Sequence, residues 1–129
     1  MKLNVLCIGD VVGRPGRRII ADKLRLVVKE HGVDCVIVNA ENAAGGSGLT
    51  RQIYDKLLRY GVNLVTLGDH TYRKREIIPT LETADNIVRP ANFSRHAAGK
   101  GVAFYKTNKG PTVAIVALIG RLYITKPGD

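Results

Sequence analysis

Acidic and amide side chains follow three apolar runs of the sequence, each at the point where the run ends. Asp10 follows the first run, Glu41 and Asn42 follow the second, and Asp69 and His70 follow the third. If these runs are neighbouring parallel strands, about 4.8 Å apart, the side chains meet at the carboxyl edge of one sheet, where open α/β sheets bind ligands. Three carboxylates in a small volume repel one another unless a cation neutralises them. Carboxylate and amide oxygens suit magnesium, manganese or iron, so the pattern favours a metal site.

Each of these residues also has a plain structural explanation. Asp10 and Asp69 are common turn or cap residues, and Glu41 could contact only solvent. His70 could cap the following helix from its loop. The glycines of residues 9–16 could cradle a phosphate at a helix N-terminus, but they match neither a Walker A sequence nor GxGxxG and could simply serve a tight turn. The coincidence of three carboxylates at one expected sheet edge makes the metal site the stronger interpretation.

The elements that must position these residues alternate between strands and helices. Runs rich in β-branched residues predict buried parallel strands, and apolar residues at helical spacing predict the helices between them. Thr50 is a good N-cap, Gly32 and Gly61 are natural helix stops, and Pro79 kinks the third helix or ends its first part. The expected strands are residues 2–9, 34–40 and 63–67, and the expected helices are residues 17–31, 51–60 and 73–83. This βαβαβα order predicts an α/β fold with parallel strands and right-handed crossovers.

The last third of the sequence changes character. Residues 86–89 predict a short strand, and residues 100–106 and 112–118 predict a β-hairpin around a turn at 107–111. The sequence contains no internal repeat, low-complexity tract or linker, so residues 1–129 are expected to form a single domain. No further strand or helix pattern follows residue 118 to cover the other face of the hairpin. We therefore expect that this domain is cut short at its C-terminus.

The composition is that of a globular protein with an excess of positive charge. Of the 129 residues, 45% are hydrophobic and 24% are charged, and the formal net charge is +9. A basic balance favours anionic partners such as nucleotides, nucleic acid or phosphate esters. For the cations of the first helix, a solvated helix face is the preferred interpretation. The five Tyr and two Phe show no interleaved stacking pattern of the kind that single-strand binders use.

The two cysteines and the hydropathy of the chain favour a cytosolic protein. Cys7 and Cys35 each lie inside an apolar run and form no CxxC pair, so we expect buried free thiols without a redox or zinc role. No apolar run approaches the roughly 18 residues that span a bilayer. The N-terminus enters a strand-like run without a signal-peptide cleavage pattern. We expect a cytoplasmic location and no membrane partner.

Four motifs of the chain resemble those of the bacterial YmdB-like metallophosphoesterases. They are residues 9–17 (GDVVGRPGR), 39–44 (NAENAA), 68–71 (GDHT) and 89–93 (RPANF), in the same order over residues 3 to about 121. The resemblance implies the N-terminal half of a calcineurin-like α/β sandwich. It also implies a dinuclear iron or manganese centre and phosphodiesterase activity, including on 2′,3′-cyclic nucleotides and thus on RNA-related substrates.

The resemblance also implies a role for each site residue. Asp10 and Asn42 would hold the first metal, Glu41 would bridge both metals and Asp69 would hold the second. His70 would be the catalytic proton donor to the leaving oxygen. The chemistry is consistent, because two metals can clamp a phosphoryl group and histidine is a suitable acid for a departing alkoxide.

The chain departs from the family pattern in two ways. The family usually has Asn at the position of Asp69, and it draws three further histidine ligands from its C-terminal half. The later histidine of this chain, His96, matches no motif, and we interpret it as a surface residue. The first hypothesis is therefore a metal-dependent phosphoesterase. The alternative is an inactive truncated relative or a nucleotide- or RNA-binding module, and either could form a homo-oligomer.

Overall fold

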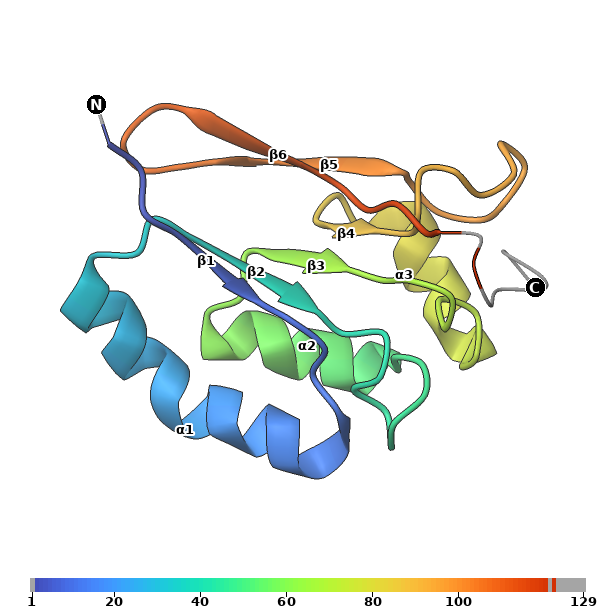
Figure 1. The fold of residues 1–129 in the computed structure, drawn as a ribbon, viewed down its shortest axis with the longest axis horizontal. Helices are drawn as coiled ribbons and strands as arrows, with labels where there is room; N and C mark the ends of the chain where they lie inside the picture. Colours follow the sequence, from blue (N-terminus) through green and yellow to red (C-terminus); the bar gives the residue numbers. More distant parts are fainter. Residues whose placement is uncertain (1, 121, 123–129) are drawn as a thin grey trace.

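A four-stranded parallel sheet forms the centre of the protein. The computed structural model describes residues 2–120 and 122 (Figure 1). The sheet contains β1 (Val5–Ile8), β2 (Cys35–Asn39), β3 (Leu64–Thr66) and β4 (Ile87–Val88), which lie side by side in that order. All three neighbouring pairs are parallel. The predicted α/β fold with parallel strands is therefore confirmed.

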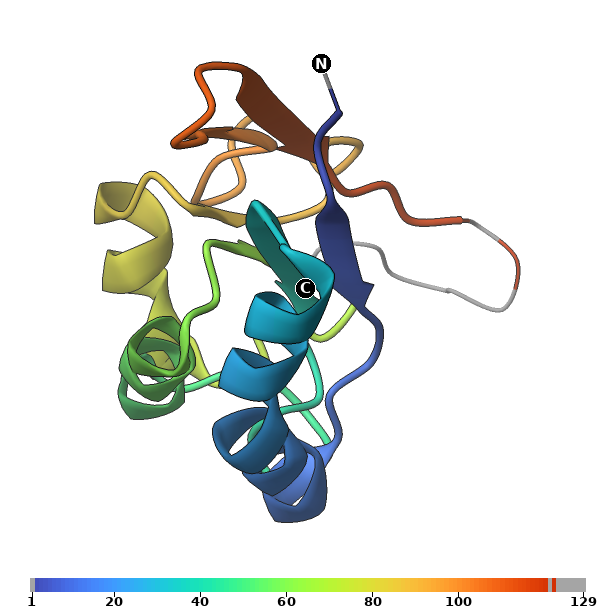
Figure 2. The same ribbon diagram turned by 90° about the vertical axis from the view of Figure 1, so that its left-hand side faces the viewer.

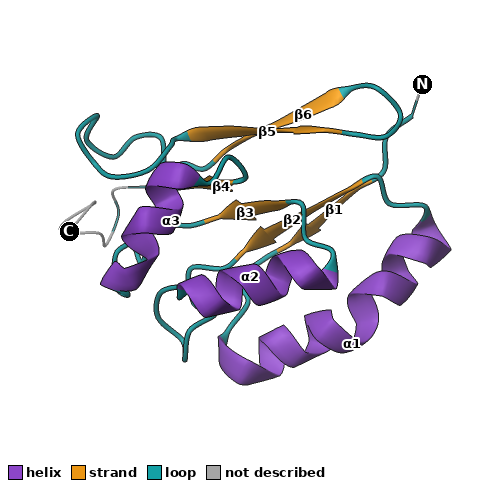
Figure 3. Cartoon of the chain, turned by 180° about the vertical axis from the view of Figure 1, so that it is seen from behind, coloured by secondary structure: helices purple, strands orange, loops and turns teal. Residues whose placement is uncertain are grey.

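Two further layers cover the two faces of this sheet. One consists of helices α1 (Gly13–His31) and α2 (Arg51–Tyr60), and the other of the hairpin β5 (Val102–Lys106) and β6 (Thr112–Val116). Figures 2 and 3 show the helices on one side of the sheet and the hairpin on the other. Side chains alternate between the faces, so Val36 and Val38 pack in the helix-side core while Cys35 packs under the hairpin. The predicted hairpin is confirmed, with shorter strands.

The helix boundaries follow local signals at most positions. Helix α2 occupies the predicted residues, because the Thr50 hydroxyl accepts the Ile53 N–H at 3.2 Å and Gly61 ends the helix in the left-handed conformation. Gly32 ends α1 in the same way. The region predicted as a third helix is a 3₁₀ turn, η1 (Arg75–Ile77), followed by α3 (Ile78–Thr83). Pro79 lies in the first turn of α3, where its missing N–H needs no partner.

The start of α1 was wrongly predicted. The helix begins at Gly13 and not at residue 17. Pro15 is compatible with this start, because the N–H groups of a first helical turn have no intrahelical partner. The Gly13 N–H donates to the Asn42 carbonyl at 3.0 Å, which fixes the start of α1 against the loop after β2.

The burial of β1 was also wrongly predicted. We expected a strand covered on both faces and a buried Cys7, but β1 is an edge strand and Cys7 is exposed. Leu6 and Ile8 pack against the helix-side core, whereas Val5 and Cys7 alternate with them along the strand and are exposed, Val5 by 42%. Cys35 is a buried free thiol, as predicted, because β2 lies inside the sheet.

An Asn or Asp residue immediately precedes every strand of the parallel sheet. The Asn63 side-chain oxygen accepts the Val36 N–H at 2.8 Å, and the Asn86 amide donates to the Asn63 carbonyl at 3.3 Å. The Asp34 carboxylate accepts the Asn4 N–H at 2.9 Å and the Lys109 ammonium of the hairpin turn at 2.9 Å. The Lys109 bond ties the hairpin turn to the sheet, and the others join neighbouring strands at its amino edge. The four residues are Asn4, Asp34, Asn63 and Asn86.

Two remaining expectations concern the membrane and the tail. Within the described residues, no helix has the length and apolar character that crossing a membrane requires. The expectation that nothing after residue 118 covers the hairpin falls mostly on residues outside the described part.

Candidate metal and phosphate site

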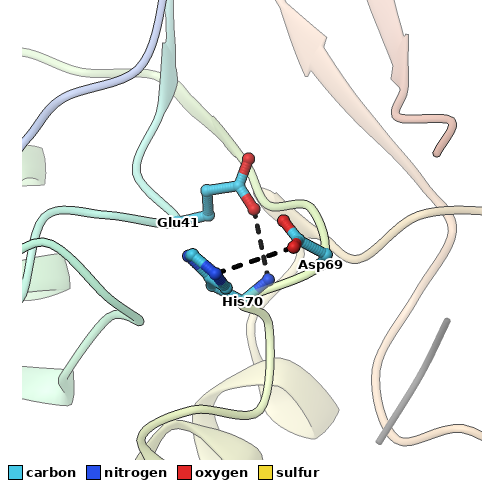
Figure 4. A group of neighbouring side chains, drawn as sticks. All are labelled: Glu41, Asp69 and His70. Carbon is cyan, nitrogen blue, oxygen red and sulfur yellow. Dashed lines mark hydrogen bonds and ion pairs between the residues drawn. The ribbon is translucent and has the colours of Figure 1, made fainter. Parts of the chain in front are cut away.

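Three of the predicted site residues converge at the carboxyl edge of the sheet. Glu41 follows β2, and Asp69 and His70 lie in the loop after β3 (Figure 4). One potential ligand atom from each of the three lies within 4.8 Å of the others. The His70 Nε2 atom lies 3.6 Å from the Asp69 carboxylate, and the His70 backbone N–H donates to Glu41 at 3.2 Å. The sheet topology thus brings together side chains from two loops that are well separated in the sequence.

The Glu41 carboxylate lies in an environment that disfavours its negative charge. Burial, and then the neighbouring Asp69 carboxylate, raise the pKa of Glu41, while the His70 N–H opposes this rise. The carboxylate also lies against the backbone of Gly68, where the Cβ of any larger residue would meet both oxygens and the carboxyl carbon at 2.6 Å or less. A cation at this position would relieve the repulsion between the two carboxylates.

Asn42 connects the other two predicted site residues. Its amide nitrogen donates to Asp10 at 2.6 Å, and its side-chain oxygen lies 2.5 Å from His70 Nδ1. A carboxylate only accepts hydrogen bonds, so Asp10 fixes the orientation of the Asn42 amide. The amide oxygen then faces His70, which places the proton of a neutral imidazole on Nδ1 and leaves Nε2 open.

Backbone hydrogen bonds hold the loops that carry these residues. The Val11 N–H donates to the Asn39 carbonyl at 3.1 Å and joins the loop after β1 to the end of β2. The Thr71 hydroxyl donates to the Gly68 carbonyl at 2.6 Å and closes the loop after β3. Asp10 has a φ of 27°, which is in the left-handed region that a non-glycine residue rarely adopts. Such strained residues concentrate at functional sites.

The comparison with protein families identifies the group to which this architecture belongs. The family model described as YmdB-like protein matches residues 6–129. The chain belongs to the YmdB-like family. The resemblance of its four motifs to this family is therefore confirmed.

Relatives of this YmdB-like chain are known by sequence and by structure. The 2′,3′-cyclic-nucleotide 2′-phosphodiesterase of Bacillus subtilis is 42% identical over 98% of the chain, which covers 48% of that protein. A hypothetical protein from Thermus thermophilus superposes with a TM-score of 0.87 at 37% identity, over 97% of this chain and 48% of the other. A novel phosphatase of Mycoplasma pneumoniae gives a TM-score of 0.83 at 34% identity, over 92% and 43% of the two chains. The YmdB-like chain thus spans about half the length of these relatives.

All five residues predicted for the YmdB-like site lie on connected loops at one sheet edge. Glu41, Asp69 and His70 form the cluster, while Asp10 reaches it through Asn42. The assignment of ligands and proton donor among them stays a prediction. His96 is exposed.

Sequence reasoning missed Asn39 as a residue of this site. Its amide nitrogen lies 3.5 Å from the Glu41 carboxylate, and its oxygen is buried without a hydrogen-bond partner among the described residues. Asn39 is part of the 39–44 motif, but as the last residue of β2 it reads as a strand residue.

The residues present fit a bound cation. The cluster offers two carboxylates beside the His70 imidazole, and carboxylate oxygens suit iron or manganese. The buried Asn39 oxygen is a further unpartnered acceptor among the described residues, on the side chain beside Glu41. Hard oxygen donors with unsatisfied negative charge are what a divalent or trivalent metal site provides.

Proposed function

We propose that this protein is a metal-dependent phosphoesterase that hydrolyses 2′,3′-cyclic nucleotides. The convergence of Glu41, Asp69 and His70 at the carboxyl edge of the sheet carries this proposal. The B. subtilis relative named as a 2′,3′-cyclic-nucleotide 2′-phosphodiesterase supports the substrate class. Because that relative is about twice as long, the activity of the whole protein belongs to the proposal.

The residues that would hold metal come from all three loops. Glu41 and Asp69 would hold one ion, and Asp10 and Asn42, together with Glu41, would hold a second. Bound iron or manganese supplies Lewis-acid polarisation of the phosphoryl oxygens and a nucleophile at neutral pH. The three further histidine ligands that the family resemblance implies stay a prediction. They would come from a region beyond residues 1–129, which cover about half of the B. subtilis relative.

His70 is the proposed proton donor. Asn42 keeps the Nδ1 proton in place, so Nε2 is the nitrogen that exchanges a proton with the substrate. The Asp69 carboxylate lies 3.6 Å from this nitrogen. In hydrolysis, a P–O bond forms to the oxygen of a water molecule, the bond from phosphorus to the ribose 2′ oxygen breaks, and that oxygen takes the proton from Nε2. The attacking water loses one proton to the solvent, and Nε2 takes up a proton again before the next turnover. The product is a nucleoside 3′-phosphate.

The test is hydrolysis of 2′,3′-cyclic AMP by the purified protein, extended to about the length of its relatives, with Mn²⁺ and with a chelator. We expect 3′-AMP only in the presence of metal, and loss of the activity in Glu41→Gln. The exposed Glu30→Gln on α1 is the matched control, and it should keep the activity. Turnover that persists in the chelator, or an unchanged Glu41→Gln variant, would contradict the proposal.

The alternative is a binding module without hydrolytic activity. The cations gathered near the start of α1 favour it, since they could hold a nucleotide or RNA without chemistry. Metal content separates the two, because a binding module needs none. We expect that the 129-residue chain holds fewer than two ions per protomer and holds them weakly. The cytoplasmic location and a homo-oligomeric state stay predictions.

A further inference from the structure

A basic hollow lies between helices α1 and α2. It has a volume of about 420 Å³ and is lined by Arg14, Arg17, Arg18, Lys56 and Tyr60. Among its described lining residues none is acidic, so four cations face one small volume. Figure 3 shows the two helices side by side below the sheet. The sequence alone favoured a solvated helix face for these arginines. A solvated face leaves unexplained why cations from two helices line the same hollow.

Most of the cations that line this basic hollow are free to bind an anion. Arg14 and Lys56 have no ion-pair partner among the described residues. Arg18 lies 3.6 Å from Asp22, but both side chains are mostly exposed, and such pairs are weak. The residues of the first turn of α1 include no carboxylate, so the positive end of the helix dipole adds to the potential.

The basic hollow begins next to the loop that carries Glu41. The Arg17 guanidinium donates to the Ala43 carbonyl, and the Gly13 N–H donates to the Asn42 carbonyl. From Gly13, Arg18 lies five residues along the helix, or about 7.5 Å at the usual rise. A chain of phosphates that occupies the hollow can therefore end close to the candidate metal site.

We propose that the basic hollow binds the phosphate backbone of a single-stranded RNA segment whose 3′ end enters the metal site. The choice of RNA over DNA as the ligand rests on the proposed function, since only a ribose carries the 2′ oxygen of a 2′,3′-cyclic phosphate. Arginine and lysine contacts to phosphates are independent of base sequence. Tyr60 offers an aromatic ring on which a base can stack. The substrate class is then an oligonucleotide end and not only a mononucleotide.

The test is the fluorescence anisotropy of a labelled oligouridine of about ten nucleotides in the presence of chelator, with residues 1–129. The test variant is Arg14→Gln combined with Lys56→Gln, which leaves the Arg17 bond to the loop intact. We expect affinity to fall about 10–30-fold at about 0.1 M salt, and the slope of log K against log salt to fall by about 1.4, or roughly 0.7 per lost phosphate contact. The matched control, Lys23→Gln with Lys29→Gln, removes the same charge from exposed positions of α1 outside the hollow.

Four other outcomes would reject the inference, and a fifth would reject only the proposed function. Equal losses in both double variants would mean binding by net charge alone, and no binding of oligouridine by the parent protein would exclude the ligand. An aspartate-rich peptide of equal charge that binds as tightly, with the same loss in the test variant, would assign the hollow to an acidic protein segment instead. The anisotropy is measured in chelator, so hydrolysis cannot affect it. RNA binding by this chain, together with no 2′,3′-cyclic AMP turnover by the extended protein in Mn²⁺, would defeat the proposed function and leave this binding surface. Turnover with unchanged RNA binding in the test variant would defeat the inference alone.

Discussion

Gly68 lies against the Glu41 carboxylate, and replacing it with alanine should separate metal binding from stability. An alanine Cβ would lie 2.5 Å from Glu41 Oε1, whereas ordinary van der Waals contact begins at 3.4 Å. The Oε2 atom would lie closer still, so the carboxylate must move by more than 0.9 Å, the difference between these two distances. It is the end of a flexible side chain, so the fold can accommodate the move. Changes of this kind around a metal ligand typically cost about 10–100-fold in metal affinity or activity, and we expect a Mn²⁺ affinity lower by that factor.

The stability of the metal-free protein should change in the opposite direction. The φ of Gly68 lies outside the left-handed region, so alanine fits the backbone and reduces the entropy of the unfolded chain, which stabilises the fold by about 0.4–1 kcal/mol. Titration calorimetry with Mn²⁺ and urea unfolding in chelator measure the two effects. Gly9→Ala, in the loop after β1, is the matched control because no atom lies within 4 Å of its Cβ. Unchanged Mn²⁺ affinity in Gly68→Ala, together with a loss of stability above about 2 kcal/mol, would refute the reasoning.

Three further predictions test individual residues. In the protein extended to the length of its relatives, His70→Ala should lower kcat by roughly 10²–10⁴-fold on 2′,3′-cyclic AMP but much less on bis-p-nitrophenyl phosphate, because nitrophenolate leaves without a proton donor. Equal losses on both substrates would exclude the acid role. Asp69→Ala should weaken Mn²⁺ binding in calorimetry and leave far-UV circular dichroism unchanged, while lost folded signal with intact metal binding would identify a structural cap. Hydrogen bonds from the Asn4 N–H and then from Lys109 lower the pKa of Asp34 below 3.8. The ionised Asp34 therefore stabilises the fold above pH 3.8, and this stabilisation is lost as the pH falls through the lowered pKa. The urea midpoints of the parent protein and Asp34→Asn should therefore differ at neutral pH and converge below pH 3.8, and a gap of constant size would argue against this origin.

Local sequence signals predicted the elements whose ends are set by adjacent residues. Thr50 and Gly61 defined α2 correctly because a cap acts within one helical turn. The start of α1 at Gly13 depends on the Asn42 carbonyl, which is far away in the sequence. The exposure of Cys7 depends on the order of strands in the sheet, which an apolar run does not encode.

The candidate site was predictable as a gathering of residues but not in its internal contacts. Parallel strands with right-handed crossovers bring the loops after β1, β2 and β3 to one edge whatever their side chains. The contacts within the site depend on side-chain rotamers and on backbone hydrogen bonds between loops. These contacts are those of Asn42 with Asp10 and His70, and of Glu41 with Gly68. The basic hollow needs both α1 and α2 in place, so the charge pattern of one helix could not reveal it.

The Asn and Asp residues that precede the four strands have a consequence for how the chain selects its strand register. β2 consists almost entirely of apolar residues, and both of its faces are covered, so a slip of two residues along a neighbour would still bury apolar side chains. The hydrogen bond from the Val36 N–H to the Asn63 side chain, and its counterpart at Asn86, form only in the native pairing. A slip of two residues would move one strand end by about 6.6 Å relative to its neighbour, which is more than the spread of the Glu41, Asp69 and His70 ligand atoms. Polar residues at the amino edge therefore determine which side chains meet at the opposite edge.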